Sequence, residues 1–112
     1  MNEINILDKT ISIKGAIYDC QYLVKDAFID GNNLIILYSP DAKPDRNKQF
    51  RNLVCMCSTG EIIWEAELPT TMSNDVYYKI HTTNPLVVYS RCSYECEISK
   101  TTGRILRKEF YK

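Results

Sequence analysis

One stretch, from Leu53 to Pro69, constrains the fold of this chain more than any other. Apolar and polar residues alternate over two short runs, and a Ser-Thr-Gly sequence ending at Gly60 separates them. A period of two is typical of β-strands, and glycine supplies the positive φ that tight turns need. We therefore predict a hairpin with one apolar and one wet face. The apolar face would carry Leu53, Cys55, Cys57, Ile62, Trp64, Ala66 and Leu68, and the wet face Glu61, Glu65 and Glu67.

Other segments repeat the strand pattern. Isoleucines alternating over 4–6 and 11–13 predict two short strands around a turn at a sheet edge. The Asp30-Gly31 pair predicts a hairpin turn after a strand that covers at least 25–29. The run 34–38 is apolar throughout, which predicts a central strand buried on both faces, and the polar stretch 39–51 predicts a surface loop.

The second half of the chain resembles the first. Residues 35–39 correspond to 86–90, and Thr59-Gly60 corresponds to Thr102-Gly103. We predict one all-β domain, residues 1–112, with an internal duplication over approximately 18–68 and 76–112. Each copy would be an antiparallel meander, and the two consecutive meanders would pack as propeller blades or as a two-layer sandwich.

Charge and cysteine content narrow the functional classes. Fourteen basic and fourteen acidic residues give a formal net charge of zero, so no global field favours nucleic acid or an anionic membrane. We expect no secretory signal and no membrane span. Five cysteines are an odd number without a regular framework, which predicts reduced thiols in a cytoplasmic protein.

The residues that could do chemistry are few. Cys55 and Cys57 lie in an alternating strand rather than on turns where four zinc ligands converge, so we interpret them as core residues and expect no metal and no cofactor. His81 is the single histidine, and any nucleophile activated by imidazole would depend on it. No Gly-rich phosphate loop and no Gly-x-Ser-x-Gly elbow occurs.

Carboxylates and tyrosines suggest a binding surface. Alternation along 76–81 puts Tyr77 on the outward face as an aromatic anchor. Acidic residues of both hairpins would steer a partner with a basic surface, although a merely solvated face also explains them. The predicted partner-binding residues are Glu61, Glu65, Glu67, Tyr77, Glu95 and Glu97. The loop Asp41 to Arg51 is the alternative contact region.

Two resemblances accompany these patterns. The hairpin with Gly60 followed by Glu61-Ile62-Ile63-Trp64-Glu65 resembles a blade hairpin of quinoprotein-like propellers, which implies a blade-like fold. The ending Tyr94-x-Cys96-Glu97-Ile98, Thr102-Gly103-Arg104-Ile105 and Lys108-Glu109-Phe110 is similar to small immunity proteins of contact-dependent growth-inhibition and Rhs-type toxin systems. That resemblance implies tight binding of a cognate toxin, often a nuclease.

The sequence thus leads us to expect a non-catalytic protein-binding module, specifically an immunity protein that neutralises a cognate bacterial toxin. Two alternatives remain open. One is a small enzyme that uses His81, and the other is a structural or oligomerising β module, which unprotected strand edges would favour.

Overall fold

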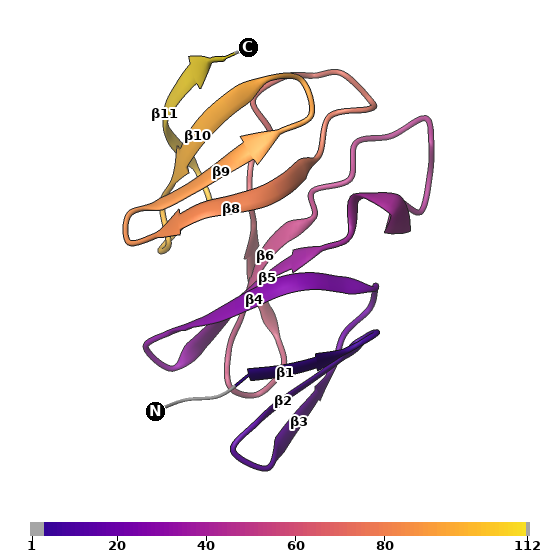
Figure 1. The fold of residues 1–112 in the computed structure, drawn as a ribbon, viewed down its shortest axis with the longest axis vertical. Coiled ribbons are helices and arrows are strands. Elements are labelled where there is room, and N and C mark those ends of the chain that lie inside the picture. The colour runs from indigo at the N-terminus through magenta and orange to yellow at the C-terminus, as the bar shows by residue number, and fades with distance from the viewer. Residues whose placement is uncertain (1–3, 112) are drawn as a thin grey trace.

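The computed structural model describes residues 4–111, and these form three antiparallel sheets that follow one another along the chain (Figure 1). Sheet A contains β1 (Ile4–Leu7), β2 (Thr10–Ile13) and β3 (Ala16–Asp19). Sheet B contains β4 (Val24–Asp30), β5 (Asn33–Tyr38), β6 (Leu53–Met56) and β7 (Ile62–Glu65). Sheet C contains β8 (Tyr77–Thr83), β9 (Leu86–Ser90), β10 (Tyr94–Ile98) and β11 (Ile105–Phe110). The predicted all-β class with consecutive meanders is confirmed.

Turn residues define the hairpins as the sequence indicated. Asp30 ends β4 and Gly31 follows with a φ of +61°, so the predicted turn before β5 is confirmed. Gly60 and Gly103 have φ values of +92° and +77° in the corresponding turns of sheets B and C. The polar segment 39–51 contains no strand and includes a short 3-10 turn, η1 (Pro40–Ala42).

Two apolar layers lie on opposite faces of sheet B. Leu34 and Ile36 of β5 pack toward sheet A, whereas Ile35 and Leu37 pack in the layer shared with sheet C. All four side chains are at most 5% exposed, which confirms the prediction of a strand buried on both faces. Sheet B is therefore the middle layer of the molecule, as its place between the other sheets in Figure 1 shows.

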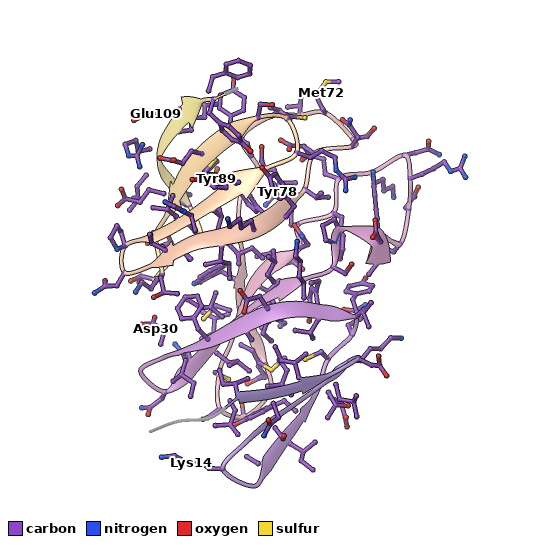
Figure 2. All side chains as sticks on the ribbon, viewed as in Figure 1. Lys14, Asp30, Met72, Tyr78, Tyr89 and Glu109 are labelled. Carbon is purple, nitrogen blue, oxygen red and sulfur yellow. The ribbon has the colours of Figure 1, made fainter. Side chains whose placement is uncertain are left out.

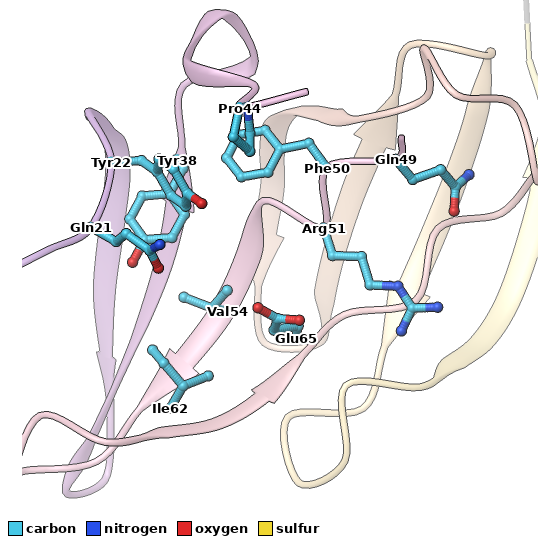
Figure 3. A pocket seen from close by; sticks show the side chains of 10 residues that line it. All are labelled: Gln21, Tyr22, Tyr38, Pro44, Gln49, Phe50, Arg51, Val54, Ile62 and Glu65. Carbon is cyan, nitrogen blue, oxygen red and sulfur yellow. The ribbon is translucent and has the colours of Figure 1, made fainter. Parts of the chain in front are cut away.

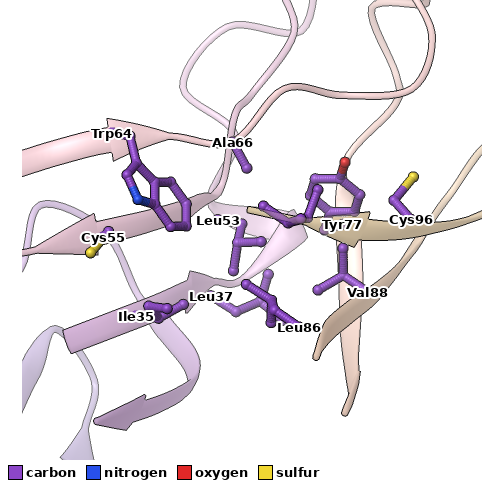
Figure 4. Packing of buried hydrophobic residues seen from close by; sticks show 11 residues of the cluster. Ile35, Leu37, Leu53, Cys55, Trp64, Ala66, Tyr77, Leu86, Val88 and Cys96 are labelled. Carbon is purple, nitrogen blue, oxygen red and sulfur yellow. The ribbon is translucent and has the colours of Figure 1, made fainter. Parts of the chain in front are cut away.

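One of these layers lies between sheets B and C (Figure 4). Trp64, Leu53 and Leu37 of sheet B contact the layer formed by Tyr77, Leu86, Val88, Cys96 and Ile98 of sheet C. Cys55 and Cys96 occupy corresponding third strands and both are fully buried. The strands of sheets B and C follow the chain in the same order. The predicted repeat segments 35–39 and 86–90 therefore fall on equivalent strands, β5 and β9. A common origin by duplication stays a prediction.

Sheet A differs from the expected pair of edge strands. Residues 16–19 add a third strand, and the turn before it is formed by Lys14 and Gly15 with φ values of +47° and +84°. Two consecutive positive φ values are typical of the type I′ hairpin turn. These strands form a separate sheet, whose Ile11 is buried in the layer against sheet B.

The predicted apolar face of the second hairpin strand is partly wrong. The register of β6 with β7 shifts between Cys55 and Met56, so Met56 pairs with Ile62 while Cys55 pairs with Trp64. This bulge puts Ile62 on the same face as Glu65 and leaves it 45% exposed. Trp64 and Ala66 are buried as expected.

None of the helical structure within residues 4–111 is long and apolar enough to cross a membrane.

Candidate functional site

The six predicted binding residues do not form one surface. Glu95 and Glu97 lie on the face of sheet C that is turned away from sheet B. Glu61, Glu65 and Glu67 belong to the hairpin of β7, and their environments differ from one another.

The assignment of Tyr77 is wrong. Its side chain is fully buried between sheets B and C, and its hydroxyl donates to the carbonyl oxygen of Glu67 at 2.6 Å. Burial raises the pKa of the Tyr77 phenol well above its ordinary value. The physical cause is a register irregularity between Tyr77 and Lys79, which breaks the simple alternation along β8. Tyr78 reaches the outer face instead.

Ion pairs gather the carboxylates of sheet C around one guanidinium. Arg107 of β11 contacts Glu109 at 2.7 Å, Glu95 at 3.4 Å and Glu97 at 3.6 Å. The register of β10 with β11 produces this arrangement, because Glu95 lies opposite Glu109 and Glu97 lies opposite Arg107. Three carboxylates against one guanidinium leave this part of the face acidic.

Aromatic side chains occupy the neighbouring part of the same face (Figure 2). The ring of Tyr89 lies 5.1 Å from Tyr111, 5.1 Å from His81 and 6.4 Å from Tyr78, measured between centroids. The hydroxyls of Tyr78 and Tyr111 are hydrogen-bonded to each other. Together with the carboxylates these residues form what we call the acidic–aromatic face: Tyr78, His81, Tyr89, Glu95, Glu97, Arg107, Glu109 and Tyr111.

Cations lie at the opposite edge of this sheet. Lys25 of β4 donates to the carbonyl oxygen of Tyr78, and its ammonium is 6.0 Å from the Tyr78 ring centroid. Lys79 is exposed on β8, opposite Tyr89 in the register. The face is consequently polarised, with carboxylates over β10 and β11 and lysines toward β8. His81 is exposed beside Tyr89 and lines neither of the two cavities described below.

The carboxylates of the β7 hairpin have three different environments. Glu61 is exposed in the turn, where it accepts a long 3.5 Å hydrogen bond from Thr59. Glu67 accepts the backbone N–H of Ile105 at 2.8 Å and so links the end of β7 to β11. Glu65 lies at a cavity, which we call the aromatic pocket.

The aromatic pocket has a volume of about 280 Å³ (Figure 3). Its wall is made by Tyr22, Tyr38, Phe50 and Val54, and the last three are at most 6% exposed. Tyr22 packs edge-on against both Tyr38 and Phe50 at centroid distances of 5.2 and 5.0 Å. Burial raises the pKa of Tyr38 to about 12, so this phenol is neutral at ordinary pH.

The rim of this pocket is polar and comes from separate segments. It contains Gln21, Gln49, Arg51 and Glu65, together with the apolar Pro44 and Ile62. Gln49 donates to the carbonyl oxygens of Thr70 and Met72 at 2.6 and 3.0 Å, which ties the loop 39–52 to the segment after β7. The predicted alternative contact loop and the predicted Glu65 thus meet at one cavity, an arrangement that sequence reasoning missed.

A smaller cavity of about 130 Å³ lies beside the turns 31–33 and 57–58, and Cys57 lines it. Hydrogen bonds from Thr59 and from turn amides lower the pKa of the Cys57 thiol, whereas burial raises that of Cys55 and of Cys96 to about 11. All five cysteines are free. Across residues 4–111, no three His, Cys, Asp or Glu side chains converge as a metal site would require.

Fold and surface together define a class: a small all-β protein of three stacked meanders with one acidic–aromatic face and one aromatic pocket. The chain belongs to the family described as "Domain of unknown function (DUF7957)", whose model matches residues 1–110. No curated protein matches the chain in sequence. Among solved structures, the computationally designed Ika8 protein superimposes with a TM-score of 0.54 at 10% identity, over 95% of this chain and 35% of the designed one. The chain therefore spans about a third of the designed protein's length, and the likeness concerns the fold alone.

Proposed function

We propose that this chain is a non-catalytic protein-binding module, and specifically an immunity protein that neutralises a cognate bacterial toxin in the cytoplasm. The acidic–aromatic face is the docking surface. The supporting observation is the set of three carboxylates around Arg107, because Glu95, Glu97 and Glu109 exceed its charge and adjoin four exposed or half-buried rings. The partner is a toxin with a basic surface, such as a nuclease.

The composition of this face suits protein binding. Tyrosine provides a large, amphipathic contact with few rotatable bonds, and Tyr and Arg are enriched among the residues that dominate interface energies. Carboxylates at the edge accelerate association with a basic surface through long-range attraction. The rings would bury against the partner while the carboxylates pair with its lysines and arginines. The toxin is then inhibited by occlusion, and no residue of this chain needs to react.

The test is a co-purification from the native host followed by quantitative binding. A candidate partner must bind at a ratio of one to one, and its toxic activity must fall in proportion to the amount of this protein added. An enzyme that inactivated the toxin would act well below that ratio. A stable assembly of this chain alone, with no effect on the toxin, would support the oligomerising alternative.

Charge reversal then tests the docking surface. Glu95→Lys combined with Glu97→Lys should slow association about tenfold or more at low salt, with a smaller effect at high salt. Glu61→Lys is a single-reversal control, since Glu61 is also a carboxylate but lies in the turn of sheet B, and each single variant Glu95→Lys and Glu97→Lys is compared with it. Equal rates for the double variant and the wild type would refute the acidic–aromatic face as the docking surface.

A further inference from the structure

The aromatic pocket carries two opposite charges at its mouth. Arg51 and Glu65 both line the cavity, and Figure 3 shows the Glu65 carboxylate beside Val54 and the Arg51 guanidinium further from the rings. Within residues 4–111 every ion pair involves Arg107, so Arg51 and Glu65 do not pair with each other. Both residues are exposed, and neither side chain takes part in a hydrogen bond within that range. The rim therefore offers a guanidinium and a carboxylate that are bound only by solvent.

Aromatic and apolar side chains form the buried wall of the pocket. Val54, Phe50 and Tyr38 are at most 6% exposed, and the interlocked rings leave a cavity of about 280 Å³. Ligand pockets in proteins usually range from about 300 to 1,000 Å³, so the size suits a very small molecule. Ile62, which the bulge in β7 turns toward this side, adds an apolar lip.

Electrostatics restricts the ligand further. A simple anion would be attracted by Arg51 and repelled by Glu65, and a simple cation would meet the reverse. A neutral apolar molecule would gain nothing from either charge, because both would stay hydrated. A molecule with one negative group, one positive group and an apolar body satisfies the guanidinium, the carboxylate and the apolar wall together.

We propose that the aromatic pocket binds a free α-amino acid with an apolar side chain. Its carboxylate pairs with Arg51, its ammonium group pairs with Glu65, and its side chain packs on Val54 and Phe50. This site shares no residue with the acidic–aromatic face, and the proposal does not depend on the toxin-binding function.

Titration of the full chain with L-leucine tests the proposal. Binding is measured by calorimetry and by the chemical-shift changes of Val54 and the ring residues. We expect a dissociation constant at or below about 1 mM. N-acetyl-leucine lacks the ammonium charge and leucinamide lacks the carboxylate, and each should bind about tenfold more weakly. Glycine lacks the side chain and should also bind at least about tenfold more weakly.

Rim variants separate the two charges. Glu65→Gln should weaken the binding of leucine about tenfold, and this variant should bind leucine and N-acetyl-leucine with nearly equal affinity. Arg51→Gln should also weaken the binding of leucine about tenfold, and it should bind leucine and leucinamide with nearly equal affinity. Glu61→Gln and Arg104→Gln are controls of the same chemistry outside the pocket, and should bind leucine as the wild type does. Absence of binding at about 10 mM leucine, or equal binding of the blocked derivatives by the wild type, would overturn the proposal.

Discussion

Replacing Gly103 by alanine should damage the contact between sheets B and C. Gly103 is buried in the turn before β11 and has a φ of +77°. A Cβ atom built there would lie 2.7 Å from Cε3 and 2.8 Å from Cδ2 of Trp64. The indole cannot easily move away, because its Nε1–H donates to the carbonyl oxygen of Lys100 at 2.9 Å in the same turn.

Two effects set the magnitude of the loss. A positive φ costs an L-residue about 1 to 2 kcal/mol. Insertion of a methyl group into a packed contact costs a further 1 to 3 kcal/mol or so. Gly103→Ala should therefore lower the free energy of unfolding by about 2 to 5 kcal/mol, which is a large part of the stability of a small domain. Urea unfolding followed by tryptophan fluorescence would measure it.

Gly60→Ala is the matched control. Gly60 has a φ of +92° in the equivalent turn of sheet B, yet nothing lies within 4 Å of a Cβ atom there. Its substitution should cost only the backbone part, about 1 to 2 kcal/mol. In a Trp64→Leu background, Gly103→Ala should also cost no more than that, and circular dichroism must follow this unfolding because Trp64 is the single tryptophan. Equal losses for Gly60→Ala and Gly103→Ala in the wild type would refute the role of the indole.

Three further predictions concern buried or perturbed groups. Asn52→Ala should destabilise by about 3 kcal/mol or more in urea unfolding, because the buried amide donates to the carbonyl oxygens of Tyr38 and Tyr77 and accepts the N–H of Tyr77. Cys57 should react first with iodoacetamide, as peptide mass spectrometry would detect, since its thiol pKa is lowered while burial raises that of Cys55; preferential labelling of Cys55 would contradict this. The pKa of Tyr38 is raised from 10.0 to about 12, so the unfolded state loses its proton first and stability should fall as the pH rises from 10.0 toward 12. Tyr38→Phe should reduce that slope, and an unchanged slope would contradict the assignment.

Local pattern was enough for much of the fold. The apolar run 34–38 correctly indicates a buried strand, and the Asp30-Gly31 pair correctly indicates a hairpin turn. Both features depend on residues that are close in the chain. Alternation predicts the wrong environments for Ile62 and Tyr77, because each lies next to a register shift between strands. Such a shift depends on how two strands pair, which alternation within one strand does not reveal.

The candidate sites were less predictable for the same reason. The pattern of their own strand predicts Glu95 and Glu97 as binding residues, but Arg107 and Glu109 join them only through the pairing of β10 with β11. The aromatic pocket takes residues from the segment after β3, from β5, from the polar loop and from the β6–β7 hairpin. No spacing in the sequence brings these segments together.

Directional bonds between sheets B and C explain why the pocket has a defined shape. Apolar packing alone is not directional, but Asn52 donates to the carbonyl oxygen of Tyr77 and Trp64 to that of Lys100 across this interface, and Glu67 accepts the N–H of Ile105. Phe50 and Arg51 directly precede Asn52, and Glu65 directly follows Trp64. Phe50 of the wall and the backbone of both charged residues are thus held by neighbours in the chain that link the two sheets. A substitution within the interface would move the pocket as well, so only rim variants can separate ligand binding from folding.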